Sequence, residues 1–301
     1  LVKLQTYEPR NMTINSSQKD FLIKDGLWKG YKLWDLYKEA QTPLKWQKEL
    51  FNYAKKIKIP CFSTPYDDEG VDLLKELNSK LYKVSSFEMK DSSLVKKICS
   101  IGKPVIISTG LANLKEISEV YKVAKKSGCK KLVLLYCVSS YPAKNRDFNL
   151  NNINILKKKF KCEIGLSDHT MGIGTSIAAV AKGAVVIEKH FKFSEKNKSV
   201  DSLFSMTPYQ MKSLVNESIN AWKSLGKIKI GVTGNEKNNL KYRRSIYVIK
   251  HIKKNELLTK ENIKCIRPGF GLKTIYFEKT LNKKARKNLI AGTPLKKNMF
   301  K

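Results

Sequence analysis

Short apolar runs alternate with amphipathic stretches along the first two thirds of the chain. The runs lie at residues 2–7, 61–65, 82–86, 104–109, 132–138, 162–169 and 184–191. Apolar strands that are each followed by helical periodicity are typical of a parallel sheet with both faces covered by helices. Seven such units in a row favour an α/β fold of the (β/α)8 TIM-barrel type, and a doubly wound sheet is the alternative. Because residue 1 already leads into a strand-like run, we expect the first barrel strand to be missing and to precede this sequence.

Capping signals place two of the helices. The stretch 44–54 is amphipathic, and Thr42-Pro43 is expected to cap it. Three residues predict the start of the helix that ends the barrel: Thr207 as N-cap, Pro208 at the first helical position and Gln210 as the partner of a capping box. The segment 8–42 is long for a barrel loop, so we expect it to close over the mouth of the barrel.

The pattern changes after Gly226. We predict a barrel domain over residues 1–228, incomplete at its N-terminus, a polar linker over 229–240 and a small domain over 241–301. Short strands and turns are expected in this last part at 245–249, 265–271 and 291–295.

The formal net charge of +33 raises the possibility of a nucleic-acid partner. However, only six of the 59 basic residues are Arg, which proteins that read bases favour, and the lysines are spread over every predicted helix. We therefore expect no nucleic-acid partner and interpret the lysines as solvated surface that also attracts anionic substrates.

No apolar run approaches the ~20 residues that cross a bilayer, so we expect no membrane partner. The six cysteines form no CxxC pair, which favours a reducing, cytoplasmic location.

Polar residues gather where the predicted strands end, and parallel strands end at one mouth of a barrel. His169 and His190 end consecutive runs, so their imidazoles are candidates to share one metal ion, unless both are ordinary core histidines. Lysines and hydroxyls at the other strand ends suit a phosphate or a carboxylate. These residues favour metal-assisted chemistry between a carbonyl compound and a phosphorylated acid, with a Schiff-base aldolase built on Lys83 as the rival.

Five segments carry a resemblance to a known family, namely residues 2–7, 82–88, 103–110, 164–170 and 187–191. Together they resemble the sialic acid synthase family, whose members condense phosphoenolpyruvate with an amino-sugar aldehyde. The segment Ile266-Arg-Pro-Gly269 resembles the antifreeze-like (SAF, β-clip) domain that follows the barrel in that family. The resemblance covers essentially the whole chain.

The resemblance also implies roles for individual residues. His169 and His190 would bind a divalent metal, most often Mn²⁺, with Mg²⁺ or Co²⁺ as alternatives, and would act in catalysis together with Glu88 and Glu188. The implied phosphoenolpyruvate ligands are Lys3, Thr64, Lys83, Ser86, Ser139, Tyr141 and Ser167. The implied sugar ligands are Gln5, Tyr141, Asp201 and Arg267. Arg267 would reach into the site of a second subunit, which implies a domain-swapped homodimer.

Within the family, residues 26–43, 84–88 and 200–205 resemble the pseudaminic acid synthases, which act on 2,4-diacetamido-2,4,6-trideoxy-L-altrose. The alternative is an N-acetylneuraminate or legionaminic acid synthase that uses N-acetylmannosamine or a related sugar. A basic binding protein on a degenerate barrel is a third hypothesis.

Ser85 and Ser139 depart from the residues common in the family, Ala and Asn respectively. The acidic residue and the Asn-His segment of the family's first strand are absent, which we interpret as an incomplete sequence rather than an inactive remnant.

Overall fold

The computed structural model describes residues 1–196 and 198–301. The chain forms two compact units, Leu1–Gly226 and Lys227–Lys301, and each is described by itself. The predicted end of the barrel at residue 228 lies close to this division.

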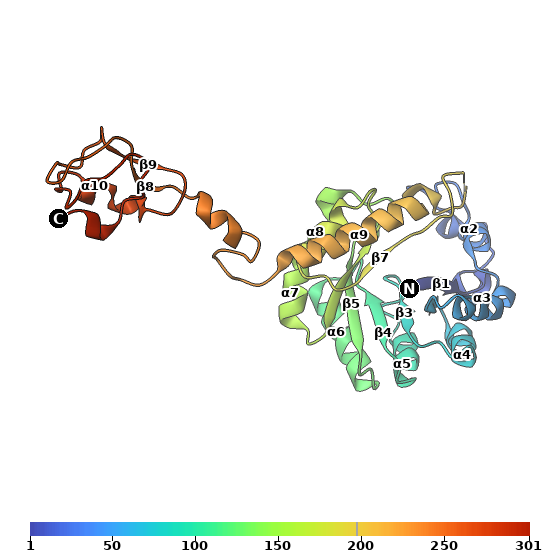
Figure 1. Cartoon of the computed structure of the whole chain (residues 1–301). Coiled ribbons are helices and arrows are strands. Elements are labelled where there is room, and N and C mark those ends of the chain that lie inside the picture. Colours follow the sequence, from blue (N-terminus) through green and yellow to red (C-terminus); the bar gives the residue numbers. More distant parts are fainter. Residues whose placement is uncertain (197) are drawn as a thin grey trace. The chain divides into compact units, whose positions relative to one another are not determined.

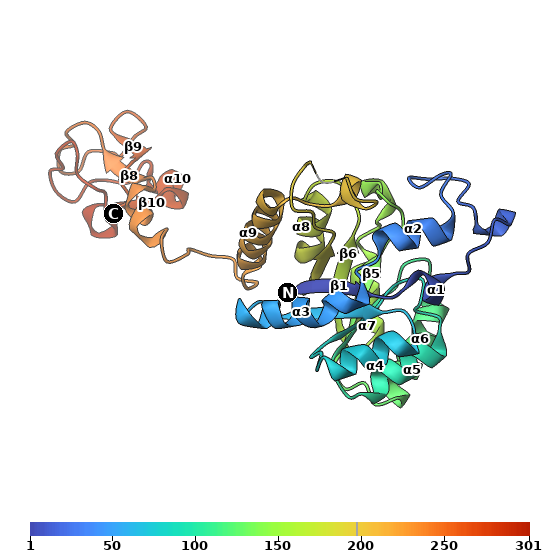
Figure 2. The ribbon, with the colours of Figure 1, turned by 90° about the vertical axis from the view of Figure 1, so that its right-hand side faces the viewer.

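The first unit is built on a curled parallel sheet with helices around it (Figures 1 and 2). Its strands pair in chain order, and each lies within one of the seven predicted apolar runs. They are β1 (Val2–Thr6), β2 (Cys61–Pro65), β3 (Tyr82–Val84), β4 (Val105–Ser108), β5 (Leu132–Cys137), β6 (Glu163–Asp168) and β7 (Ile187–Lys189). The arrangement is TIM-barrel-like, which confirms the predicted fold class. Among the described residues, β1 and β7 do not pair with each other through their backbones.

Helices cover the outer face of this sheet. They are α3 (Leu44–Lys56), α4 (Asp68–Glu76), α5 (Ser92–Ser100), α6 (Leu114–Lys126), α7 (Asn152–Lys159), α8 (Gly174–Ala181) and α9 (Pro208–Leu225). Two further helices, α1 (Pro9–Met12) and α2 (Leu33–Ala40), lie in the long segment between β1 and α3. Short 3-10 turns lie at η1 (Lys19–Phe21), η2 (Asn145–Asp147) and η3 (Ser202–Phe204). Outward-facing strand residues such as Val84, Ile107 and Leu134 pack with α5 and α6 in a continuous buried core. Burying apolar surface on this scale is the main force that holds the helices to the sheet.

The predicted helix caps are partly confirmed. Thr207 and Gln210 form the reciprocal capping box at the start of α9. At α3, however, Pro43 occupies the N-cap, and its side chain makes no capping hydrogen bond. The start of α3 is therefore fixed by the restricted φ of proline and not by a threonine hydroxyl.

The second unit contains a small antiparallel sheet with the order β10-β8-β9. Its elements are η4 (Lys237–Tyr242), β8 (Ser245–Val248), β9 (Ile263–Ile266), β10 (Leu272–Lys273), η5 (Thr274–Tyr276), α10 (Phe277–Thr280) and η6 (Lys297–Met299). Ile246, Val248 and Leu295 belong to its separate core. The segment 291–295 forms a turn and an isolated bridge between Tyr247 and Pro294. Part of the predicted linker is helical, because η4 begins within it.

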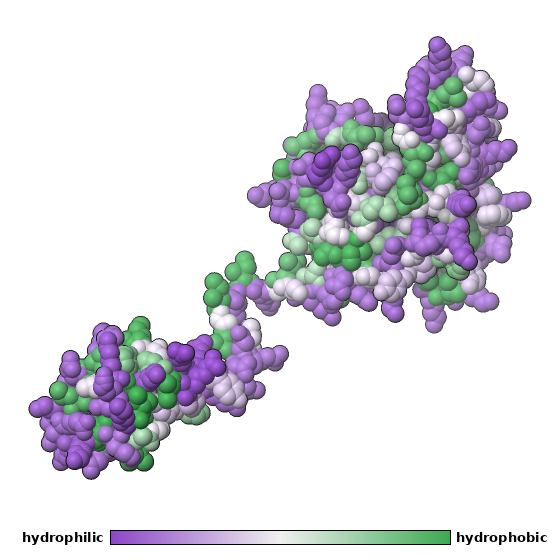
Figure 3. All heavy atoms as spheres, turned by 90° about the horizontal axis from the view of Figure 1, so that it is seen from above, coloured by the Kyte–Doolittle hydropathy of each residue, from purple (hydrophilic) through white to green (hydrophobic). Residues whose placement is uncertain are grey.

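Hydrophilic side chains cover much of both units on the face shown in Figure 3. This agrees with lysines that lie on solvated surfaces along the whole chain. Among the residues described, no helix is both long enough and apolar enough to span a membrane.

Candidate active site

A cavity of about 510 Å³ lies where the strands of the first unit end. Most of the predicted site residues line it, although they come from segments spread between residues 3 and 201. They are Lys3, Gln5, Lys83, Ser86, Glu88, Ser139, Tyr141, Ser167, His169, Glu188, His190 and Asp201. Thr64 is buried in β2 and is not among the lining residues. Arg267 lies in the second unit, directly after β9, and is exposed.

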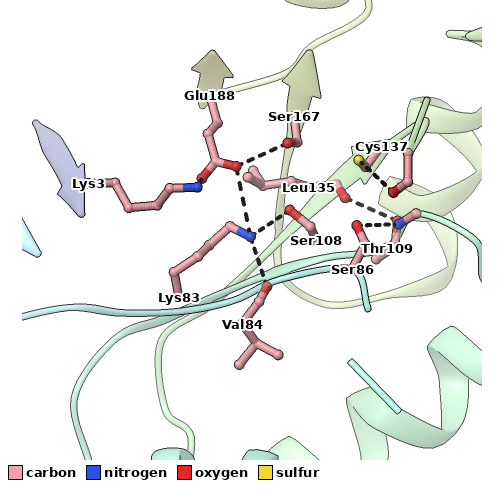
Figure 4. Close-up of polar contacts among 12 residues, drawn as sticks. Lys3, Lys83, Val84, Ser86, Ser108, Thr109, Leu135, Cys137, Ser167 and Glu188 are labelled. Atoms are coloured by element: carbon pink, nitrogen blue, oxygen red, sulfur yellow. Dashed lines mark hydrogen bonds and ion pairs between the residues drawn. The ribbon is translucent and has the colours of Figure 1, made fainter. Parts of the chain in front are cut away.

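Glu188 is the centre of a charged cluster at the bottom of the cavity (Figure 4). One carboxylate oxygen lies 2.9 Å from the Lys3 ammonium. The other accepts a hydrogen bond of 3.0 Å from the Ser167 hydroxyl and lies 3.8 Å from the Lys83 ammonium. Burial alone would raise the pKa of Glu188, but Lys83 and Lys3 outweigh it and lower the pKa to about 2. This carboxylate is therefore ionised at neutral pH.

Lys83 is almost fully buried, with 1% of its surface exposed. Its ammonium donates to the Val84 carbonyl oxygen at 2.8 Å and to the Ser108 hydroxyl at 2.7 Å. Burial lowers the pKa of Lys83 to about 8, although Glu188 acts in the opposite direction. The site thus holds a lysine in a fixed position that is still mostly charged at pH 7.

Serine hydroxyls and a glycine lie beside these lysines. The Gly110 amide donates to the Ser86 hydroxyl at 3.1 Å. A Cβ at position 110 would collide with the hydroxyls of Ser139 and Ser86, so only glycine allows the backbone to approach this closely. Lysines, hydroxyls and a tightly packed backbone together form an environment suited to a phosphate or a carboxylate.

His169 and His190 lie next to each other at another part of the cavity, with ring centroids 5.4 Å apart. Nδ1 of His169 lies 3.0 Å from the Val138 carbonyl oxygen, and Nδ1 of His190 lies 3.4 Å from an Asp201 carboxylate oxygen. Partners of this kind favour the tautomer that presents Nε2 to a metal ion. In the described part of the chain, no group of three or more His, Cys, Asp or Glu side chains is arranged to hold an ion. The pair therefore fits a divalent metal held by two imidazoles, with its other positions left to substrate or water oxygens.

Aromatic rings surround the two histidines. Tyr141 stacks against His169 with ring centroids 4.4 Å apart, and Phe204 lies 4.8 Å from His190. Trp28 lies 5.5 Å from Tyr141, and its indole N–H donates to the Val200 carbonyl oxygen at 2.9 Å. Since Trp28 belongs to the segment 8–42, this contact shows that the segment does reach over the mouth, as the sequence predicted.

One wall of the cavity was not predicted from the sequence. Leu33, Leu36, Tyr37 and Ala40 lie on one face of α2, and all four line the cavity. Tyr7 joins this wall through ring contacts with Tyr37 and Tyr66, and both of those tyrosines line the cavity too. The spacing i, i+3, i+4 and i+7 over residues 33–40 is the signal that would have revealed a helical face here.

Comparison with known proteins agrees with this geometry. The NeuB family matches residues 1–230, and the SAF domain matches residues 243–301. Pseudaminic acid synthase of Campylobacter jejuni subsp. jejuni serotype O:23/36 (strain 81-176) is 40% identical over 300 residues, which are 100% of this chain and 88% of that protein. N,N'-diacetyllegionaminic acid synthase of Campylobacter jejuni subsp. jejuni serotype O:2 is 38% identical over 95% of this chain and 87% of that protein.

A solved structure is similar as well. The N-acetylneuraminic acid synthetase of Leptospira borgpetersenii serovar Hardjo-bovis, crystallised with citrate, aligns with a TM-score of 0.69 and 31% identity over 79% of this chain and 78% of that one. Fold, cavity and similarity over the full length agree with one another. The chain belongs to the NeuB family and ends in a SAF domain.

Proposed function

We propose that this protein is a transferase that condenses phosphoenolpyruvate with 2,4-diacetamido-2,4,6-trideoxy-L-altrose, giving pseudaminic acid and phosphate. The observation that carries the proposal is the 40% identity to pseudaminic acid synthase across the whole chain. The cavity supports it, because its lysine cluster suits a phosphorylated acid and its histidine pair suits a carbonyl compound held at a metal. We assign Lys83 to anion binding rather than to a Schiff base, in line with the relatives.

Phosphoenolpyruvate would lie at the charged cluster. Lys3 and Lys83 would hold its phosphate and carboxylate, and the hydroxyls of Ser86, Ser139 and Ser167 would donate hydrogen bonds to them. Tyr141 would contact both substrates. Thr64 would contribute only from behind the cavity wall, because it does not line the cavity.

The sugar would lie at the histidines, with its remaining contacts to Gln5, Tyr141 and Asp201. His169 and His190 would hold a divalent ion, for which we propose Mn²⁺ with Mg²⁺ or Co²⁺ as alternatives, and this ion would supply Lewis acidity to the aldehyde. The ring centroids of Trp28 and Phe204 lie 6.4 Å apart beside this part of the site.

Carbon 3 of phosphoenolpyruvate attacks the aldehyde carbon, and positive charge develops on carbon 2. The ionised Glu188 carboxylate stabilises this charge. Water then adds to carbon 2, and phosphate leaves by cleavage of its C–O bond. Burial raises the pKa of Glu88, so this carboxyl group is suited to carry a proton during these steps.

Three further features belong to the proposal. Arg267 is exposed, and its guanidinium would complete the site of a second subunit in a domain-swapped homodimer. All six cysteines are free, which is in keeping with a reducing compartment, and we propose the cytoplasm. The partners would be the two small substrates, without nucleic acid or membrane.

The test is phosphate release from phosphoenolpyruvate in the presence of Mn²⁺, with the altrose derivative and N-acetylmannosamine supplied separately. We expect release that depends on the altrose derivative and is abolished by chelation. In H₂¹⁸O the label should enter the sugar acid at carbon 2 and not the phosphate. Release with N-acetylmannosamine alone, or label in the phosphate, would contradict the proposal.

The second candidate is a legionaminic acid synthase. The 38% identity to the diacetyllegionaminic acid synthase favours it nearly as strongly. The two candidates share the phosphoenolpyruvate chemistry and differ only in the acceptor sugar, so the ratio of kcat/KM for the competing sugars separates them.

A further inference from the structure

An ion pair is buried behind the cavity, on the opposite face of the sheet. Asp168 in β6 and Lys189 in β7 lie directly opposite each other in the parallel register. The Lys189 ammonium lies 2.9 Å from Asp168 Oδ2, and their side chains are 1% and 0% exposed. Neither residue lines the cavity.

Thr170 and Ser176 surround this pair with hydrogen bonds. Lys189 also donates to the Thr170 carbonyl oxygen at 2.6 Å. Asp168 Oδ1 accepts from the amide and the hydroxyl of Thr170 at 2.8 and 2.7 Å, and Oδ2 accepts from the Ser176 hydroxyl at 2.5 Å. Ser176 belongs to α8, so the pair joins two strand ends to the first turns of a helix.

A buried ion pair of this kind adds little net stability, because desolvation of both charges offsets their attraction. The pair does, however, raise the free energy of any other register between β6 and β7. A shift of one residue between β6 and β7 would send one of the two charges to the other face and leave both without their partners. The network therefore specifies how the ends of the two strands are aligned.

That alignment sets the positions of the two histidines. His169 and His190 each follow a member of the pair in sequence, and adjacent residues of a strand point to opposite faces. Glu188 is held independently by Lys3, Lys83 and Ser167. The only ion pair of His190 within the described residues is the one with Asp201, at 3.4 Å. The position of the His190 imidazole therefore depends mainly on the position of β7.

We propose that Asp168 and Lys189 are positioning residues that hold the imidazoles of His169 and His190 at the separation needed to share one divalent metal ion. This inference rests on the proposed function, since it assigns a task to residues behind that site. Asp168 and Lys189 would touch neither the ion nor the substrates.

The decisive variant is the double substitution Asp168→Leu/Lys189→Met, which replaces both charges by apolar side chains and leaves none buried alone. We expect this variant to fold with a lowered Tm, because the buried polar groups of Thr170 and Ser176 lose their hydrogen-bond partners. Its affinity for Mn²⁺, measured from the electron paramagnetic resonance signal of the free ion, should fall about 10- to 100-fold, as is usual when support behind metal ligands is lost. The KM for phosphoenolpyruvate should change much less than the affinity for Mn²⁺.

Two further variants complete the test. Asp72→Leu/Lys97→Met removes an exposed pair of 2.8 Å between α4 and α5, and it should leave Mn²⁺ binding unchanged. Ser176→Ala removes one hydrogen bond from Asp168 without exposing a charge, so it should fold even if the double variant does not, and weaken Mn²⁺ binding about fivefold.

A folded double variant with the Mn²⁺ affinity of the parent would overturn the inference and leave the proposed function intact. Unchanged Mn²⁺ binding by Ser176→Ala, if the double variant does not fold, would overturn it too. A parent protein that binds no Mn²⁺ would instead overturn the metal role of the histidines, and the inference with it.

Discussion

The two parts of the cavity are built in different ways. The phosphate part, where phosphoenolpyruvate would bind, consists of charged side chains at strand ends, and Glu188, Lys83, Ser108 and Ser167 are fixed by hydrogen bonds and an ion pair among them. The sugar part consists of the two histidines and the aromatic rings around them, and Trp28 reaches it from a long connecting segment. On the proposed function, the donor of the reaction would be bound by the sheet itself, whereas the acceptor would be bound largely by segments added to it. Differences in acceptor sugar among related proteins are therefore expected to lie in those added segments.

The largest effect should come from the two histidines of the sugar part. His169→Ala or His190→Ala removes one of two imidazole ligands, and we expect kcat to fall at least about 10³-fold. His251→Ala, in the second unit, is the matched control and should leave kcat unchanged. Phosphate release under saturating substrates measures the effect. Near-normal turnover by both cavity variants would show that the histidines are only packing residues.

Lys83→Met tests the phosphate part alone. Removing this ammonium leaves Glu188 with one fewer cationic neighbour and takes a charge from the bound anion, so kcat/KM for phosphoenolpyruvate should fall about 10²-fold. The KM for the sugar should stay close to that of the parent. Steady-state kinetics with each substrate varied in turn separates these two effects. Lys80→Met, which changes an exposed lysine three positions earlier in the chain, is the control.

Trp28→Ala tests the sugar part alone. It removes an aromatic wall and the hydrogen bond to Val200, and we expect the KM for the sugar to rise about tenfold with little change for phosphoenolpyruvate. Trp46→Ala is the matched control, because Trp46 lies half exposed on α3 and does not line the cavity. Equal losses for both substrates would mean that the two parts are not independent.

The smallest effect is a pH dependence that belongs to the phosphate part. Lys83 binds an anion only when protonated, and its pKa is about 8, so kcat/KM for phosphoenolpyruvate should fall as the pH rises through that value. The decline between pH 7 and pH 8.5 should be about fourfold. An active Lys83→Arg variant should lose this decline, because arginine stays charged. A profile that is the same in both proteins would assign the titration to another group.

The sequence is a good guide to the sheet and to its charged site residues. Apolar strands followed by polar ends form a local pattern, so Lys83, Ser167 and Glu188 can be placed at strand ends from the order of residues alone. The pairing of Asp168 with Lys189 was not predicted, because the sequence shows that both are polar but not that the register sets them opposite each other. The contact between Trp28 and Val200 joins residues 172 apart in the chain, and no local pattern encodes it.

In the second unit, too, the sequence alone does not show which short segments form strands. Among the short strands and turns predicted there, the segment 245–249 contains the strand β8, whereas the segment 291–295 is a turn that meets β8 at a single bridge. Short segments in a small domain follow the demands of tertiary packing more than their own propensity.

The ion pair between Lys3 and Glu188 has a consequence for the mechanics of the fold. It joins side chains of β1 and β7, two strands that are not neighbours in the described sheet. The two charges that would bind and activate a substrate thus also hold these two strands to each other. An arriving anion would compete with Glu188 for Lys3, so ligand binding and this contact between the strands would be coupled. Salt, which screens partly exposed charges, should weaken the contact and the substrate site together.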